Sequence, residues 1–302
     1  MSGPTGRTTA GRPAVHAGTF YPAAPAPLAD LVDRQLAAAA VAAERRGGEA
    51  PASSRPLGLL VPHAGLVYSG PVAAAAWQTL RAAPPATIVL VGTNHYVPAL
   101  DGLAVWPSGD WHSPLGDVEV ATALAERIAD LGPGFLAYPA AHRDEHSLEV
   151  QLPFLRRACP GSRIVPLLAG FPSRAGAERA GTTLGRLLAE VRGEGTDLVL
   201  VVSSDLVHYP AAAAAARADR DLLAAVAALD GAALAGLDEA LRRQRIPGLV
   251  CALCGLDAVL CSLAALRAMG ARTGTVLAAA TSADVPFGDP DRTVGYGAVG
   301  FA

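Results

Sequence analysis

Short runs of apolar residues recur along the chain, and longer stretches with helical spacing separate most of them. The runs lack the alternation of apolar and polar residues that a half-exposed strand shows, as strands covered on both faces do. Buried strands that alternate with helices predict an α/β fold with a central, mainly parallel sheet flanked by helices. The predicted strands are 57–61, 86–91, 163–169, 197–204 and 275–280. The predicted helices are 27–46, 70–82, 117–131, 174–192, 210–229, 231–244 and 252–269.

Two stretches near the start of the chain are small, polar and rich in glycine or proline. Residues 1–13 predict a flexible N-terminal tail, and residues 47–56 predict a surface loop. No later stretch has the composition of a linker, and no internal repeat is evident. The 302 residues therefore predict the tail 1–13 followed by a single domain over residues 14–302.

Composition and charge narrow the class of protein. Hydrophobic residues make up 51% of the chain and charged residues 17%, as in a globular protein. A net charge of −3 gives no basic surface, so we expect no nucleic-acid partner. The apolar stretch 36–43 is too short to span a bilayer, so we expect no membrane partner. Four cysteines, three of them crowded together, fit a reduced, cytoplasmic protein.

Titratable side chains follow three of the predicted strands. His63 follows the strand at 57–61, His95 follows the strand at 86–91, and Asp205 and His208 follow the strand at 197–204. A single histidine in such a place is usually a hydrogen-bonded loop residue. Ligands of open parallel sheets, however, bind beyond the carboxyl ends of strands, where distant parts of the chain meet. Two histidines with one further ligand form the facial site of non-haem iron, so the spacing favours a shared metal pocket.

A second patch, in the stretch 141–158, is dense in titratable groups. Glu145, His146 and Glu149 open a predicted helix, and Pro153 predicts a kink or break in it. Acidic residues at a helix start also complement the helix dipole without any role in a site. Both interpretations, a helix start and part of a site, stay open from the sequence.

The cysteines at 251 and 254 form a CxxC pair. Such a pair is typical of a redox centre or of half a zinc site, but cysteine is also a common core residue. Cys254 and Cys261 share one face of the predicted helix, as core residues would. Gly255 permits close approach of the backbone, and a Cys254 thiolate could supply the anionic ligand that the two histidines lack.

Motifs of several common enzyme classes are missing from the chain. It contains no HExxH, no GxxxxGK[ST] and no GxSxG, and its one GxGxxG, at residues 295–300, has no predicted helix after it. We therefore do not expect a zincin, a dinucleotide-binding fold, a P-loop or the nucleophile elbow of an α/β-hydrolase.

Six motifs together resemble one known family. They are HAGTFYP, VPHAGLVYSG, GTNHYVP, DEHSLEVQLPF, SSDLVHY and CALCG, in this order from about residue 14 to the C-terminus. The set is similar to that of the Memo-like proteins, which are called AmmeMemoRadiSam system protein B in prokaryotes. The resemblance implies a single α/β domain like that of the class III (LigB-type) extradiol dioxygenases.

The resemblance also implies roles for individual residues. His63, His95 and Cys254 match the metal ligands, with cysteine in place of the carboxylate that the dioxygenases use. Asp205 and His208 match residues that line the pocket, and His208 falls where the dioxygenases keep an acid/base histidine.

Three further residues near these motifs carry expectations. His146 is expected to join the catalytic residues, with Glu149 nearby. Cys251 could compete with Cys254 as a ligand or form a disulfide with it.

The function implied is that of a mononuclear non-haem iron redox enzyme or oxygenase acting on a small molecule, with aromatic substrates as candidates. Fe(II) is the first expectation for the metal, with Cu and Zn as alternatives. The alternative function is a copper- or iron-binding protein without turnover, or a module that binds protein partners. A cysteine ligand favours a soft metal such as Cu(I), whereas His208 and Asp205 favour an enzyme.

Overall fold

An eight-stranded sheet forms the centre of the computed structural model, which describes residues 11–45, 55–81 and 83–302. The four inner strands β7, β2, β8 and β1 run parallel to one another, and antiparallel pairs flank them on both sides. The prediction of a mainly parallel sheet in an α/β domain is confirmed. In spatial order the strands are β6 (Phe135–Ala137), β3 (Gly102–Val105), β7 (Arg163–Gly170), β2 (Thr87–Thr93), β8 (Leu198–Ser203), β1 (Gly58–Val61), β10 (Gly295–Phe301) and β9 (Gly274–Thr281).

The inner strands are buried because most of their residues are large aliphatic ones. Every residue of β1, β2 and β8 is buried, which matches their unbroken apolar runs. The run at 275–280 forms the edge strand β9 instead, and most of its residues are partly or fully exposed. Its alanines offer little apolar area for burial, so the prediction that this strand is covered on both faces is wrong.

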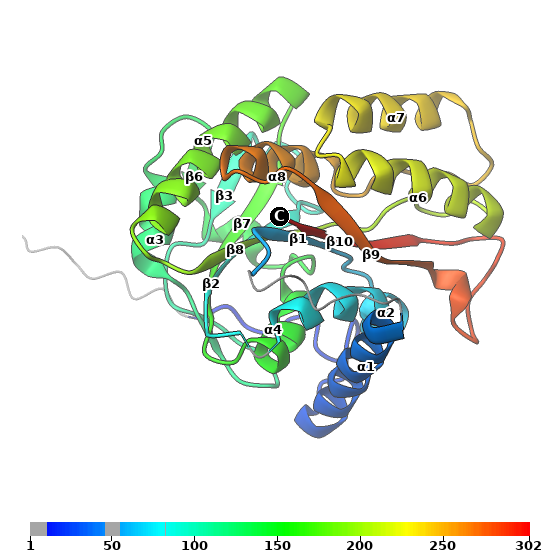
Figure 1. Ribbon diagram of the computed structural model, residues 1–302, viewed down its shortest axis with the longest axis horizontal. Coiled ribbons are helices and arrows are strands. Elements are labelled where there is room, and N and C mark those ends of the chain that lie inside the picture. Colours follow the sequence, from blue (N-terminus) through cyan, green and yellow to red (C-terminus); the bar gives the residue numbers. More distant parts are fainter. Residues whose placement is uncertain (1–10, 46–54, 82) are drawn as a thin grey trace, which may run out of the picture.

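Helices cover both faces of the sheet (Figure 1). One group contains α5, α6, α7 and α8, and the other contains α1, α2 and α4. The helix expected at 70–82 begins earlier, at Leu66, and the one expected at 117–131 is shorter because Val118–Glu119 form β5. The helices are α1 (Pro25–Arg45), α2 (Leu66–Trp77), α3 (Thr122–Ala129), α4 (Leu152–Ala158), α5 (Arg174–Gly193), α6 (Ala212–Ala227), α7 (Gly231–Arg243) and α8 (Leu256–Ala268). Short elements are β4 (Asp110–Trp111), β5 (Val118–Glu119) and the 3₁₀ turns η1 (Gln78–Leu80), η2 (Pro139–His142), η3 (Glu149–Gln151) and η4 (Ser282–Asp284).

The stretch around Glu145 and His146 is a loop, so the helix predicted to open there is wrong. The Glu145 carboxylate accepts a hydrogen bond from the Ser147 backbone N–H, 2.9 Å away. A side chain bonded to the backbone two residues on replaces helical pairing. The α-helix begins only at α4, and Pro153 lies in its first turn, where its missing N–H costs nothing.

A buried ion pair ties the N-terminal segment to this region. Arg12 is 1% exposed, and its Nη1 lies 2.6 Å from Glu149 Oε2. The same carboxylate accepts hydrogen bonds from the Tyr21 hydroxyl at 2.6 Å and the His16 backbone N–H at 2.8 Å. The segment that holds Arg12 is therefore part of the fold, whereas residues 1–10 of the predicted tail and 47–54 of the predicted loop lie outside the described residues.

The strand register brings three strand ends to one level of the sheet. Val61 of β1 and Gly92 of β2 both pair with Ser203, on either side of β8. His63, His95 and Asp205 follow these positions closely. They consequently leave the sheet side by side.

One buried carboxyl beneath this edge makes stability depend on pH. Burial raises the pKa of Asp219, on α6, from 3.8 to about 7, and this outweighs the hydrogen bond from the Val207 N–H. A pKa raised by folding gives stability that is present at low pH and is lost as pH rises through the folded value. Asp219→Asn should remove this loss, so the variant should gain about 2–3 kcal/mol relative to the wild type between pH 5 and pH 8.

Urea unfolding of both proteins at the two pH values measures this gain. Asp221→Asn, an exposed change on the same helix, is the matched control and should leave the pH dependence unaltered. Equal pH dependence of the wild type and Asp219→Asn would contradict the prediction.

None of the described helices has the length and apolar character that crossing a bilayer requires.

Candidate metal centre

Four side chains that could ligate a metal meet at the ends of the inner strands. His63, His95 and His146 each offer a donor atom, all within 4.8 Å of one another, and could hold a metal ion. The sulfur of Cys254 lies 3.4 Å from His95 Nε2 and 3.6 Å from His63 Nε2. The structure thus brings together the histidines of two strand ends, one loop histidine and the cysteine that precedes α8.

The spacing of these donors fits a metal ion. Bonds of about 2.1 Å to nitrogen and 2.3 Å to sulfur, at a tetrahedral angle, put the two donor atoms about 3.6 Å apart. The observed separations from Cys254 to the two histidines are 3.4 and 3.6 Å. A metal could therefore be bound with little rearrangement of these side chains.

The hydrogen-bond network sets the tautomer of both strand-end histidines. His95 Nδ1 lies 2.8 Å from Glu145 Oε1, and an ionised carboxylate only accepts, so Nδ1 carries the proton. Ser203 Oγ donates its hydrogen to the Ser147 carbonyl, so it can only accept from His63 Nδ1, 3.1 Å away. Both Nε2 atoms are thus left with a free lone pair, and both face Cys254.

The electrostatics of the pocket keep its buried histidines neutral. Burial lowers the pKa of His63 to about 4, although the Asp205 charge opposes this. Burial, helped by His63 and His95, lowers the pKa of His146 to about 3. Neutral imidazole is the form that binds metals, so these side chains are ready to ligate at neutral pH.

Glu145 acts as the orienting partner of His95. Its other oxygen, Oε2, accepts the His95 backbone N–H at 2.8 Å. Burial tends to raise the pKa of Glu145, but the hydrogen bonds from His95 and Ser147 lower it to about 2. A carboxylate on the far nitrogen of a ligating histidine fixes the ring and raises its basicity. The sequence left open whether Glu145 belongs to a helix start or to a site, and the fold brings it to His95.

His146 packs against the strand-end histidines, whereas Glu149 does not. The His146 ring stacks on His95 with centroids 4.4 Å apart, and it lies 5.4 Å from the His63 ring. Its Nδ1 is buried, 3.4 Å from Glu145 Oε1, with no hydrogen bond among the described residues. The expectation placed His146 among catalytic residues, and its position also suits a ligand. Glu149 is occupied by the ion pair with Arg12.

Asp205 and His208 lie at the wall of the same pocket. Asp205 Oδ1 accepts the His63 backbone N–H at 2.7 Å, so this carboxylate holds the turn after β1. Its Oδ2 lies 3.8 Å from His208 Nε2, an ion-pair distance. Burial opposes charge on His208, but the neighbouring Asp205 carboxylate and Cys251 thiol raise its pKa to about 10. His208 consequently holds a proton at neutral pH.

The CxxC turn brings only one of its sulfurs to the histidines. Cys254 approaches them, whereas Cys251 is bonded through its backbone carbonyl to the His208 N–H. The electrostatic interaction between the two thiols lowers the pKa of Cys251 and raises that of Cys254. A Cβ on Gly255 would collide with Thr93 Oγ1 and Ser204 Oγ, so glycine permits this close approach.

A cavity of about 380 Å³ opens above the histidines. Aromatic side chains form part of its wall, and Tyr68 and Phe287 meet edge to face with centroids 5.2 Å apart. The residues that line it include Phe20, His63, Tyr68, His95, His146, Asp205, His208, Tyr209, Phe287 and Arg292. This volume suits a small molecule.

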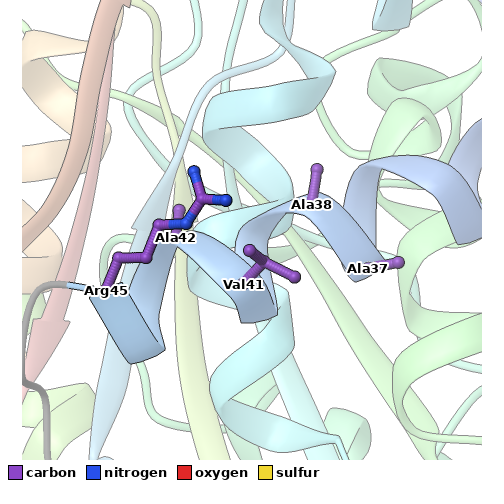
Figure 2. Close-up of a pocket in the computed structure, with 5 residues that line it drawn as sticks. All are labelled: Ala37, Ala38, Val41, Ala42 and Arg45. Carbon is purple, nitrogen blue, oxygen red and sulfur yellow. The ribbon is translucent and has the colours of Figure 1, made fainter.

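A larger hollow of about 640 Å³ lies along α1, away from this chemistry. Figure 2 shows that Ala37, Ala38, Val41, Ala42 and Arg45 line it. Arg45 is the one charged group among these described lining residues, and none of them ligates metals. The smaller cavity is therefore the candidate site.

Comparison with known proteins agrees with the six motifs. A family model described as Memo-like protein matches residues 12–300. A MEMO1 family protein of Methanopyrus kandleri is 33% identical over 298 residues, which cover 96% of this chain and 98% of the relative. One of Methanothermobacter thermautotrophicus is 34% identical, covering 94% and 98%, and one of Thermotoga maritima is 36% identical, covering 80% and 81%. The chain belongs to the family of Memo-like proteins.

Proposed function

We propose that the chain binds one metal ion through His63, His95 and Cys254 and is a mononuclear non-haem iron redox enzyme. The supporting observation is the approach of both histidine Nε2 atoms to Cys254, at 3.4 and 3.6 Å. Its substrate is a small molecule that fits a cavity of about 380 Å³. The aromatic wall formed by Phe20, Tyr68 and Phe287 favours an aromatic one.

In this proposal, the side chains around the cavity have different roles in the reaction. A bound iron ion would supply the redox chemistry of the reaction. His208 holds a proton at neutral pH beside the cavity and gives it to the substrate as a general acid. Asp205 fixes the turn of His63 and stabilises the charge on His208. The aromatic side chains exclude water from the substrate.

The donor set also supports a second function. A thiolate with two imidazoles suits Cu(I) or Zn as well as Fe(II), and sulfur favours the softer metals. The alternative is therefore a copper- or iron-binding protein without turnover, or one that binds a protein partner. Cys254 favours this alternative, and the charged His208 at the cavity wall favours an enzyme.

Metal analysis and oxygen uptake separate the two functions. Protein purified without oxygen would be loaded with Fe(II), Cu(I) or Zn(II), and the bound metal measured by mass spectrometry. Oxygen consumption would then be followed with a panel of catechols and other small phenols. Uptake that depends on both iron and one substrate supports the enzyme. Tight copper binding with no uptake across the panel supports the alternative.

Glu145→Gln should weaken metal binding by about 10–100-fold, the usual effect of losing an orienting carboxylate. Gln can keep one hydrogen bond to His95 but carries no charge to raise its basicity. Competition with a chromogenic chelator measures the affinity.

The matched control is Asp117→Asn. This change alters another carboxylate–histidine pair, in which Asp117 Oδ1 lies 2.8 Å from His112 Nδ1 on the surface. It should leave the metal affinity unchanged. Equal affinities in all three proteins would show that Glu145 does not act on the metal.

A further inference from the structure

An arginine in the loop between β9 and β10 forms part of the cavity wall. Arg292 is the one lysine or arginine among the described residues that line the cavity, and it is exposed to solvent. Its guanidinium carbon lies 3.7 Å from the centroid of the Tyr209 ring, which lines the same cavity. The Tyr209 ring therefore supports the Arg292 side chain at the cavity wall.

The backbone of Tyr209 has a conformation that bulky residues rarely adopt. Its φ is 74°, in the left-handed region. The Tyr209 N–H donates to the Thr293 carbonyl at 2.6 Å, and the Thr293 N–H donates to the Pro210 carbonyl at 3.0 Å. These bonds join the neighbours of the two side chains, so the ring and the guanidinium keep their relative position. Such strained residues persist where the surrounding structure holds them, and they cluster at sites that bind ligands.

The stack on Tyr209 leaves the hydrogen-bond donors of Arg292 unused. A guanidinium that lies over an aromatic ring uses its face, whereas its five N–H donors lie in its plane. The described structure gives this guanidinium no ion pair and no hydrogen bond. The donors of Arg292 are therefore available to an anion that enters the cavity.

The carboxylates of the cavity lining, in contrast, already accept hydrogen bonds. Asp205 accepts the His63 backbone N–H at 2.7 Å and lies 3.8 Å from His208. Asp289, in the same loop as Arg292, accepts the Asp291 backbone N–H at 2.9 Å. Among the charged residues described in the lining, Arg292 alone has no polar partner for its charge.

We propose that Arg292 binds the carboxylate of the substrate, which makes the substrate of this site a small aromatic carboxylate. The turnover of that molecule rests on the proposed function, whereas the contact with its carboxylate depends on Arg292. The planar guanidinium can donate two parallel hydrogen bonds to a carboxylate. A doubly charged phosphate would be repelled more strongly by Asp205 and Asp289, so a singly charged carboxylate suits the cavity better.

A matched pair of ligands tests this contact. The probes are para-hydroxybenzoate and para-hydroxybenzamide, which have the same ring and a similar shape, but only the benzoate is charged. Isothermal titration calorimetry would measure both dissociation constants on the full chain loaded with Zn(II), which has no redox chemistry. The wild type should prefer the benzoate by about 10–100-fold, the usual range for hydrogen bonds to a charged group. Added salt should reduce this preference.

Variants of the chain show whether Arg292 causes the preference. Arg292→Gln should remove it, because glutamine keeps hydrogen-bond donors but carries no charge. Arg292→Lys should keep part of it, since lysine is charged but cannot bind a carboxylate with a planar fork. Arg217→Gln, an exposed change on α6 outside the lining, is the matched control and should bind as the wild type does. His63→Gln, without a bound metal, should keep the preference.

The outcomes separate this proposal from the proposed enzyme. If Arg292→Gln keeps the wild-type preference, or if the wild type binds the two probes equally or binds neither, the carboxylate contact is overturned. Tighter binding of phenyl phosphate than of the benzoate would overturn the choice of a carboxylate. If the preference depends on Arg292 but the iron-loaded protein consumes no oxygen with any substrate, the carboxylate site stands and the proposed enzyme fails.

Discussion

Replacing His63 by alanine is expected to abolish stable metal binding. The change removes a donor whose tautomer is fixed by Ser203 and whose Nε2 lies 3.6 Å from the Cys254 sulfur. Loss of an orienting partner costs about 10–100-fold in affinity, and loss of a ligand should cost more. Metal content after loading and desalting should fall from about one ion per chain toward zero. The stabilisation of the fold by added metal should vanish with it.

Two further variants make this result specific. His112→Ala removes a histidine that lies on the surface and pairs with Asp117, and it should keep full metal content. His63→Gln fills more of the space left by the ring, so it guards against a loss that comes only from misfolding. A folded His63→Ala protein that keeps its metal would contradict the proposed ligand set.

His208→Ala is expected to keep the metal and to lose most of the turnover. His208 lines the cavity and faces Asp205, 3.8 Å away, whereas Cys254 contacts His63 and His95. General acid–base catalysis contributes about 10²–10⁴-fold to rates. With a substrate from the oxygen-uptake panel, kcat should fall by such a factor while KM changes little. Metal content should stay near that of the wild type.

The pH profile of the rate and the conservative variant His208→Gln show whether His208 acts in catalysis or only stabilises the turn. His208→Gln keeps a polar side chain next to Asp205 and Cys251 but has no proton to give, so it should fold normally and remain slow. The rate that remains should also lose the pH dependence contributed by His208. Loss of metal in His208→Ala would make His208 a ligand. A fall in stability with unchanged kcat would mean that the Asp205–His208 pair only braces the turn.

The inner strands of the central sheet could be predicted because they consist mostly of large aliphatic residues. The runs at β1, β2, β7 and β8 are buried on both faces, so their pattern is unambiguous. β10 was missed, since its sequence GYGAVGF is rich in glycine, a poor strand former. The short strands β3 and β6, of 4 and 3 residues, were also missed.

The candidate site was only partly visible in the sequence. The positions of His63 and His95 at strand ends indicated a shared pocket, and the resemblance to the family matched both of them and Cys254 to metal ligands. The orienting groups were harder to find because they lie far away in sequence. Glu145 is 50 residues from His95, and Ser203 is 140 residues from His63. Ser203 directly follows the apolar run of β8, which is the one local signal that it would face the pocket.

The buried pair of Arg12 and Glu149 has a consequence for motion. Arg12 also donates to the backbone carbonyls of His142 and Glu145, at 2.7 and 2.5 Å. The N-terminal segment and the loop of Glu145 and His146 therefore have to separate together, as one cooperative unit of local unfolding. Amide hydrogen exchange in the two segments should follow one opening free energy. An opening of the segment that holds Arg12 would therefore also displace His146 and the Glu145 carboxylate that orients His95.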